Sequence, residues 1–146
     1  MIPRHVSVLC TAVNPPPLPI PLFSHAVRAG FPSPADDYVA EALDLNEHLI
    51  ANKEASFFLR AKGHSMTGAG IQDGDLLVVD RSLTPAHHSV VIAVIDGEFT
   101  VKRLYKRAGR IRLLAENPDY SPIELQDGQE LEIWGVVTSV IHRLRR

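Results

Sequence analysis

The sequence predicts a mainly β fold of folded-over antiparallel sheets, with one short helix and a flexible N-terminal arm. Six segments after residue 55 are rich in branched and aromatic residues and are separated by short turn clusters. Asp96-Gly97 lies between two of these segments and favours a type I′ hairpin, whose central residues both need positive φ. The chain before residue 34 is rich in proline and has little periodicity. Closely spaced strands without alternating helices indicate a folded-over sheet or a partly open barrel.

The proline-rich segment, residues 1–33, is expected to form an extended, poorly paired arm, because proline fixes φ and has no backbone N–H. Its apolar run, residues 6–13, is interrupted by polar side chains and is followed by no small-x-small cleavage site. No stretch of the chain approaches the ~20 apolar residues that cross a bilayer. We therefore expect neither export nor membrane insertion.

Residues 36–50 allow two interpretations, which the sequence leaves open. Tyr38, Ala42, Leu45 and Leu49 recur as one face of a helix would. The segment "DLNE", residues 44–47, has instead the spacing of a capping box, which would start a shorter helix at Asp44.

Six strands are expected after this segment, at residues 56–62, 75–81, 89–95, 98–104, 110–115 and 130–144. Side chains alternate between the two faces of a strand, so Lys102 shares a face with Thr100 and Leu104. A lone strand lysine usually faces solvent. Under apolar cover, however, its pKa falls below the usual value of about 10.4, and the amine can act as a general base near neutral pH.

Length and composition limit the functions that the chain can have. Its 146 residues suffice for one domain plus a tail, and its net charge of −2 does not suggest that it grips a nucleic-acid backbone by itself. Cys10 is the only cysteine, which excludes an intramolecular disulfide and a CxxC metal or redox site. We therefore expect a reducing, intracellular compartment and no cofactor.

Ser65 lies in the segment "AKGHSMTGAGIQDGDLLVVD", residues 61–80, within a glycine-bracketed turn that leads into an apolar strand. Taken alone, a serine in such a turn is an ordinary turn residue. A hydroxyl beside an amine of lowered pKa is instead an activated nucleophile, and serine–lysine pairs are a recognised variant of the catalytic triad. The residues alone leave both interpretations of Ser65 and of Lys102 open.

The order of the motifs "FFLRAKGHSM", "GIQDGDLLVVD", "GEFTVKRL", "LLAENPDYSPI" and "WGVV" resembles the LexA/UmuD family of self-cleaving serine peptidases, across about residues 30–141. The segment "PLFSHAVRAGFPSPADDYVAEALDLNEHLI" is more similar to the UmuD branch, whose members are accessory subunits of error-prone DNA polymerases. By this resemblance Ser65 is the nucleophile and Lys102 is its general base. A backbone N–H at or near Ser65 is the implied oxyanion hole.

The resemblance also implies self-cleavage at Ala29-Gly30, because the family cuts its own chain between a small residue and a glycine. Glycine lets the backbone approach a narrow cleft closely. The implied parts are an arm, residues 1–29, and a peptidase domain, residues 30–146. The resemblance further implies a homodimer in the bacterial cytoplasm, with a RecA nucleoprotein filament as the activator of cleavage. It implies a Y-family DNA polymerase subunit similar to UmuC as the partner, in translesion synthesis during the SOS response.

The alternative is a LexA-type transcriptional regulator without its own DNA-binding domain. No helix-turn-helix pattern fits the proline-rich first 30 residues, which argues against sequence-specific DNA binding.

His87 and His88 are expected on opposite faces of an extended segment, and no metal site is predicted. Asp73 and Asp75 are expected to be turn residues. Trp134 is expected in the core or in a dimer contact. His64 is given no catalytic role.

Overall fold

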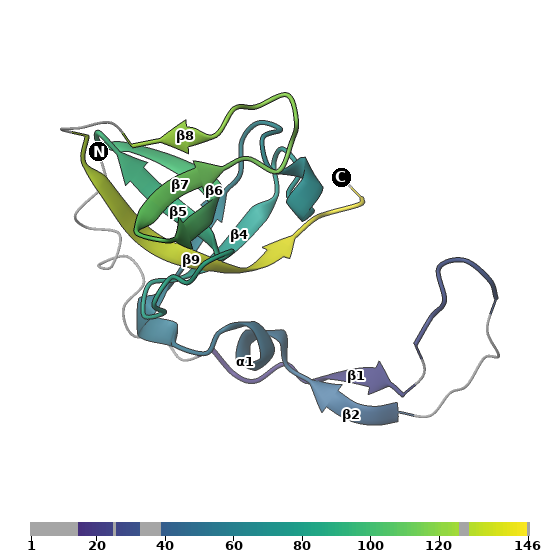
Figure 1. The fold of residues 1–146 in the computed structure, drawn as a ribbon. Helices are drawn as coiled ribbons and strands as arrows, with labels where there is room; N and C mark the ends of the chain where they lie inside the picture. The colour runs from purple at the N-terminus through teal and green to yellow at the C-terminus, as the bar shows by residue number, and fades with distance from the viewer. Residues whose placement is uncertain (1–14, 25, 33–38, 126–128, 146) are drawn as a thin grey trace. The chain divides into compact units, whose positions relative to one another are not determined.

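The computed structural model describes residues 15–24, 26–32, 39–125 and 129–145. The chain divides into two compact units, Ile2–Ala51 and Asn52–Arg146, and Figure 1 labels α1 and most of the strands. Of the helices in the described ranges, none has the length and hydropathy that a membrane span requires. Each unit is described by itself below.

The N-terminal unit contains a two-stranded antiparallel sheet of β1, Ile20–Phe23, and β2, Val39–Leu43. Pro21 lies inside β1, opposite Ala42. A proline is tolerated there because both strands of a two-stranded sheet are edge strands, where one N–H need not enter a ladder. The expectation of a poorly paired arm is therefore wrong for this part of the proline-rich segment.

The helix of this unit is the shorter of the two that the sequence allowed. α1 spans Leu45–Leu49, and the Asp44 side chain caps it by accepting a hydrogen bond from the Asn46 N–H at 3.0 Å. The second carboxylate oxygen of Asp44 accepts from the Leu18 N–H at 3.2 Å. The longer helix is wrong because residues 39–43 form β2, while Tyr38 lies outside the described residues.

The C-terminal unit is built on one seven-stranded sheet in the order β3-β4-β9-β5-β6-β7-β8, with antiparallel neighbours throughout. The strands are β3 Ser56–Arg60, β4 Leu76–Asp80, β5 Val90–Ile95, β6 Glu98–Arg107, β7 Arg110–Leu114, β8 Ile123–Glu124 and β9 Leu131–Ile141. Two short 3-10 turns are η2, Lys53–Ala55, and η3, Thr67–Ala69. All six expected strands are confirmed, and β8 is added.

The long strand β9 gives the sheet its folded-over form. Its first half, up to Val136, pairs with β5 along one edge, and its second half, from Val136 to Ile141, pairs with β4 along the other. Both ladders contain a shift in register, as at a β-bulge, which increases local bending. Figure 1 shows β9 as the long curved strand drawn in yellow.

Two tight turns fix the register of the strands around β6. Asp96 and Gly97 have φ values of 49° and 83°, which confirms the positive φ expected for the β5–β6 hairpin. Ala108 and Gly109 have φ values of 51° and 73° in the β6–β7 hairpin. The second turn was not predicted, because alanine rarely adopts positive φ. Together the two turns make β6 a central strand with a fixed register.

Buried apolar residues occupy both faces of the central strands, because the consecutive residues Val91, Ile92 and Ala93 of β5 are all buried. A buried cluster of Val91, Ala93, Leu104 and Leu113 joins β5, β6 and β7. Trp134 is also buried, as expected, and its ring lies 5.3 Å from that of Phe57 and 5.4 Å from that of Phe99. Leu104 is two residues beyond Lys102 on β6, so the apolar core continues up to the candidate base.

Candidate active site

Ser65 lies in the turn between β3 and η3. Gly63 opens this turn at a φ of 92°, a conformation that favours glycine, and donates its N–H to the Asp73 carboxylate at 2.7 Å. The turn is closed on the other side by backbone hydrogen bonds between Ala61 and Asp75 at 2.8 Å and between Gly74 and Ala61 at 2.9 Å. Asp73 thus has the turn role that the sequence predicted.

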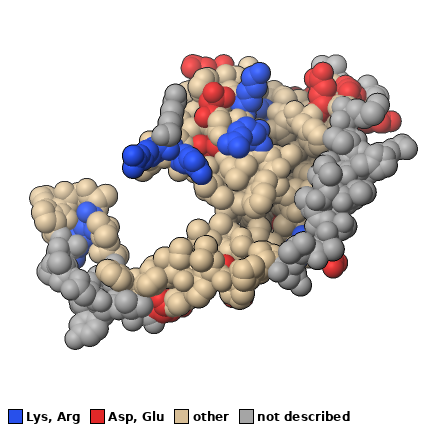
Figure 2. All heavy atoms as spheres, turned by 180° about the vertical axis from the view of Figure 1, so that it is seen from behind, with Lys and Arg blue, Asp and Glu red and all other residues tan. Residues whose placement is uncertain are grey.

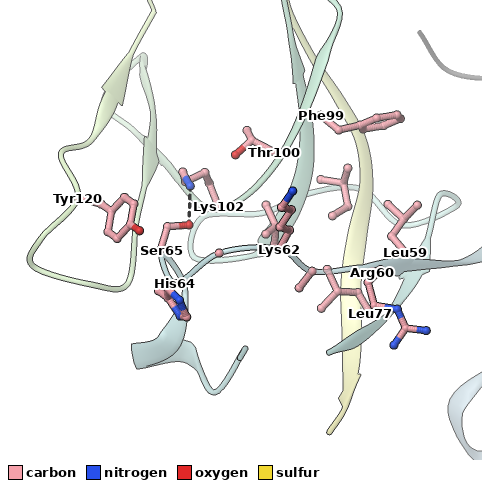
Figure 3. A pocket seen from close by; sticks show the side chains of 14 residues that line it. Leu59, Arg60, Lys62, His64, Ser65, Leu77, Phe99, Thr100, Lys102 and Tyr120 are labelled. Atoms are coloured by element: carbon pink, nitrogen blue, oxygen red, sulfur yellow. Dashed lines mark hydrogen bonds between the residues drawn. The ribbon is translucent and has the colours of Figure 1, made fainter. Parts of the chain in front are cut away.

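The structure brings Ser65 and Lys102 together, although 37 positions separate them. The Lys102 Nζ donates a hydrogen bond to the Ser65 Oγ at 2.8 Å, drawn as the dashed line in Figure 3. Lys102 comes from the middle of β6, opposite Val91 of β5, and only 8% of it is exposed. The expectation that a lone strand lysine faces solvent therefore does not apply here.

Burial lowers the pKa of the Lys102 amine from its ordinary value of 10.5. No acidic partner at Lys102 offsets this effect among the ion pairs of the described residues. A neutral amine can accept the Ser65 hydroxyl proton at the same separation that the hydrogen bond now spans. The arrangement can therefore activate the serine as a nucleophile.

A loop after β7 holds the turn that carries Ser65. The Glu116 N–H donates to the Ser65 carbonyl at 2.8 Å, and the Glu116 carbonyl accepts from the Gly68 N–H at 2.7 Å. The Asn117 side chain donates to the His64 carbonyl at 2.8 Å. A Cβ atom on Gly68 would lie 2.5 Å from the Glu116 carbonyl oxygen, so glycine is required for this close approach.

Arg103 fixes the loop to β6. Its Nε donates to the Glu116 carboxylate at 2.6 Å, and its Nη1 donates to the His88 carbonyl at 2.8 Å. Arg103 directly follows Lys102 and points to the other face of β6. The strand that supplies the amine thus also anchors the loop that holds the hydroxyl.

Ser65 and Lys102 line a cavity of about 400 Å³ on the C-terminal unit. Figure 3 shows their side chains pointing toward each other, with Tyr120 beside Ser65. An apolar part of the lining is formed by four side chains: Leu59, Leu77, Ile92 and Phe99. Residues from the end of β3 and from the first half of β6 line the cavity.

Ala29 and Gly30 belong to the other unit and are both exposed. They lie in a bend between β1 and β2, and a Cβ atom on Gly30 would meet no atom within 4 Å. The peptide bond between them is therefore sterically accessible within its own unit.

Three residues that support the site have no role predicted from the sequence: Arg103, Glu116 and Asn117. Gly68 and the segment "ENPDY" both lie within the motifs of the family resemblance, so the sequence contains the residues of this contact. A contact between two loops leaves no periodic pattern, however, so the sequence does not show that they meet.

Asp75 is also more than a turn residue. It is buried, and its Oδ1 lies 2.5 Å from the His142 Nδ1 beyond β9.

The two adjacent histidines do not lie on opposite faces. His88 has a φ of 72°, and the His87 and His88 rings are in contact with centroids 3.8 Å apart. The expectation failed because it assumed an extended backbone at this position. The His87 Nδ1 accepts a hydrogen bond from the Lys106 N–H at 3.0 Å. No group of three or more potential metal ligands occurs within the described ranges.

Comparison with known proteins identifies the family. Residues 21–138 match the family described as Peptidase S24-like. Protein ImpA of Salmonella typhimurium is 51% identical over 126 residues, which cover 86% of this chain and 85% of that protein. Protein MucA of Escherichia coli is 48% identical over 120 residues, 82% of each chain. LexA repressor 2 of Geobacter sulfurreducens is 40% identical over 142 residues, 97% of this chain and 68% of the repressor. The chain belongs to the Peptidase S24-like family.

Proposed function

We propose that this chain cleaves itself at Ala29-Gly30, with Ser65 as nucleophile and Lys102 as general base. The observation that carries the proposal is the 2.8 Å contact between the Lys102 Nζ and the Ser65 Oγ beneath apolar cover. Membership of a peptidase family supports the same reaction class. The lowered pKa of Lys102 supports its role as the base.

In the proposed reaction the neutral Lys102 amine takes the proton of the Ser65 hydroxyl while Oγ attacks the Ala29 carbonyl carbon. The resulting oxyanion is stabilised by backbone N–H groups at or near Ser65. Lys102 then gives its proton to the Gly30 nitrogen, and the peptide bond breaks to leave Ala29 esterified to Ser65. Water hydrolyses this ester and restores both side chains.

The cavity supports binding of the cleavage segment as an extended strand. β7 pairs with β6 only from Arg103 onward, so the backbone of residues 98–102 has β5 as its ladder partner on one side alone. An added strand can use such an edge through main-chain hydrogen bonds. Ala29 and Gly30 are small enough for the main chain to approach Ser65 closely. The proposed parts are thus an arm, residues 1–29, and a catalytic domain, residues 30–146.

We further propose that the processed form acts in error-prone DNA synthesis. ImpA, SamA and MucA are homologues of UmuD and are 48–51% identical to this chain over most of its length. By that similarity, the partners are a second copy of the chain, a RecA nucleoprotein filament that triggers cleavage, and a Y-family polymerase subunit.

A second candidate is a LexA-type regulator, favoured by the 40% identity to LexA repressor 2. The higher identity to ImpA, over 85% of its length, favours the mutagenesis function. On the face of the C-terminal unit seen in Figure 2, the described Lys and Arg residues lie among Asp and Glu residues and form no continuous basic stripe. That face gives no support to operator binding.

Two measurements test the proposal. The full chain is incubated with a RecA–single-stranded DNA filament, and the cut is located by mass spectrometry, with Ser65→Ala as the control. The cleaved chain and the Ser65→Ala chain are then used to capture a purified Y-family polymerase subunit. Cleavage without capture would favour the regulator, whereas no cleavage would reject the peptidase assignment.

A further inference from the structure

The tip of the β6–β7 hairpin concentrates positive charge. Six of the 15 Lys and Arg residues of the chain lie between residues 102 and 112, and no Asp or Glu occurs from residue 99 to residue 115. Lys102 contacts Ser65, and Arg103 binds Glu116. The remaining four lie toward the tip: Lys106, Arg107, Arg110 and Arg112. The hairpin is therefore strongly basic, although the net charge of the whole chain is −2.

Three of these side chains share one face of the hairpin, which we call the arginine face: Arg107, Arg110 and Arg112. Arg107 lies directly opposite Arg110, and Arg112 lies opposite Tyr105. Directly opposed residues of an antiparallel pair project from the same face, and like charges in these positions destabilise the pair. The fold therefore retains a repulsive arrangement at an exposed turn.

Counter-charge on the arginine face is limited to one carboxylate among the ion pairs of the described residues. The Glu124 Oε1 lies 3.4 Å from the Arg110 Nη2 and 2.9 Å from the Arg112 Nε. No ion pair of Arg107 occurs in the described part of the chain. Two guanidinium groups converging on one oxygen, with a third beside them, leave an excess of positive charge. Guanidinium groups arranged in this way suit phosphate oxygens.

We propose that the arginine face binds the phosphate backbone of nucleic acid without sequence preference. The aromatic ring on this face, Tyr105, is flanked by the Arg112 guanidinium at 5.8 Å and the His87 ring at 5.1 Å. These contacts cover part of the ring, and Tyr105 is only partly exposed, which limits its use for stacking on a base or for anchoring a protein. Protein interfaces depend on such buried aromatic or apolar anchors, whereas phosphate contacts need only positioned cations.

This surface is separate from the candidate active site. Lys102 and Arg107 are five residues apart on β6, about 17 Å along a strand, and alternate residues point to opposite faces. Binding of nucleic acid can therefore be tested without cleavage and without a polymerase, and its outcome is independent of the proposed function.

The test uses the full chain with Ser65→Ala, which removes self-cleavage. Fluorescence anisotropy measures its binding to a labelled 30-nucleotide single strand and to a 30-base-pair duplex, each in two unrelated sequences, from 50 to 200 mM NaCl. We expect equal binding to the unrelated sequences. With three phosphate contacts, the affinity for the duplex should fall about 40-fold over this range of salt.

Variants of the hairpin identify the surface. The double variant Arg107→Gln with Arg110→Gln should weaken duplex binding at 50 mM NaCl by about 10-fold or more. The slope of the logarithm of the binding constant against the logarithm of the salt concentration should fall by the amount expected for about two phosphate contacts. These changes remove an opposed pair of like charges, so the hairpin should remain folded. Glu124→Gln should tighten binding, because it removes the competing carboxylate. Lys53→Gln removes one positive charge from η2, outside the hairpin, and should change the affinity little.

Three results would overturn the proposal. They are no binding to either DNA at 50 mM NaCl, equal binding by the double arginine variant, and binding to polyglutamate without binding to DNA. The last result would assign the arginine face to an acidic protein instead.

Discussion

The Ser65 carbonyl accepts a hydrogen bond from the Glu116 N–H at 2.8 Å, which ties the turn of the candidate nucleophile to the loop after β7. The Glu116 side chain is in turn bound by Arg103, the residue that follows Lys102. The distance between the Ser65 hydroxyl and the Lys102 amine is therefore set by two connections to β6. One runs through the Lys102 side chain itself, and the other runs through Arg103 and Glu116.

Gly68→Ala should loosen this connection. The new Cβ atom would lie 2.5 Å from the Glu116 carbonyl oxygen, so the turn and the loop must separate. We expect a loss of about 1–3 kcal/mol in the free energy of unfolding, as for other overpacked sites, together with slower self-cleavage. Urea unfolding measures the first effect. Gly30→Ala is the matched control, because its Cβ atom meets nothing within 4 Å and its stability should match wild type.

Glu116→Gln tests whether the Arg103 pair positions Ser65. The amide keeps the shape of the side chain but loses the charge that holds the Arg103 guanidinium. We expect the self-cleavage rate to fall while its dependence on pH keeps the same midpoint, since Lys102 is untouched. Arg110→Gln is the control, because it breaks an exposed Arg–Glu pair of the same hairpin and should leave cleavage unchanged. Cleavage of Glu116→Gln at the wild-type rate would show that the pair does not position the serine.

Self-cleavage should accelerate as the pH rises. Burial lowers the pKa of Lys102 from 10.5, and the reactive form is the neutral amine. The rate should therefore rise about tenfold per pH unit below that pKa and level off above it. Gel quantification of spontaneous cleavage from pH 6 to pH 10.5 measures the profile. A rate that does not change over this range would exclude lysine as the base.

The same pKa shift predicts a change in stability with pH. Between the lowered pKa of folded Lys102 and the ordinary value of 10.5, the unfolded chain binds more protons than the folded chain. The contribution of Lys102 to stability therefore rises with pH across this window. Lys102→Met should flatten the rise in urea midpoint between pH 7 and pH 10.5. If the variant and the wild type show parallel curves, Lys102 is not desolvated in solution.

Gly30→Glu should prevent cleavage without affecting either unit. The side chain has open space in the structure, so the fold tolerates it, but a large charged group at the scissile bond hinders approach of the backbone to Ser65. The fraction cleaved at pH 10 measures the effect, with Gly30→Ala as the smaller substitution. Cutting of Gly30→Glu between residues 29 and 30 at the wild-type rate would show that steric fit does not define the site.

The sequence predicted the strands of the C-terminal unit well, because their composition and the Asp96-Gly97 turn are local signals. It also identified Ser65 and Lys102, but only the resemblance joined them, since a contact over 37 positions has no local pattern. The β1–β2 pair is not evident from the sequence, because proline favours poorly paired chain in general, although edge strands accept it. The expectation for His87 and His88 was wrong because it assumed an extended backbone, whereas His88 has a φ of 72°.

The most direct test of the central claim is the mass of the products formed by the purified chain at pH 10. Wild type and Lys106→Ala, which removes an exposed lysine of the same strand, should yield the fragments 1–29 and 30–146. Ser65→Ala, Lys102→Ala and Lys102→Arg should stay intact while keeping wild-type circular dichroism, because each lacks either the hydroxyl or a base that can become neutral. Formation of the same fragments by Ser65→Ala or Lys102→Ala would contradict the account.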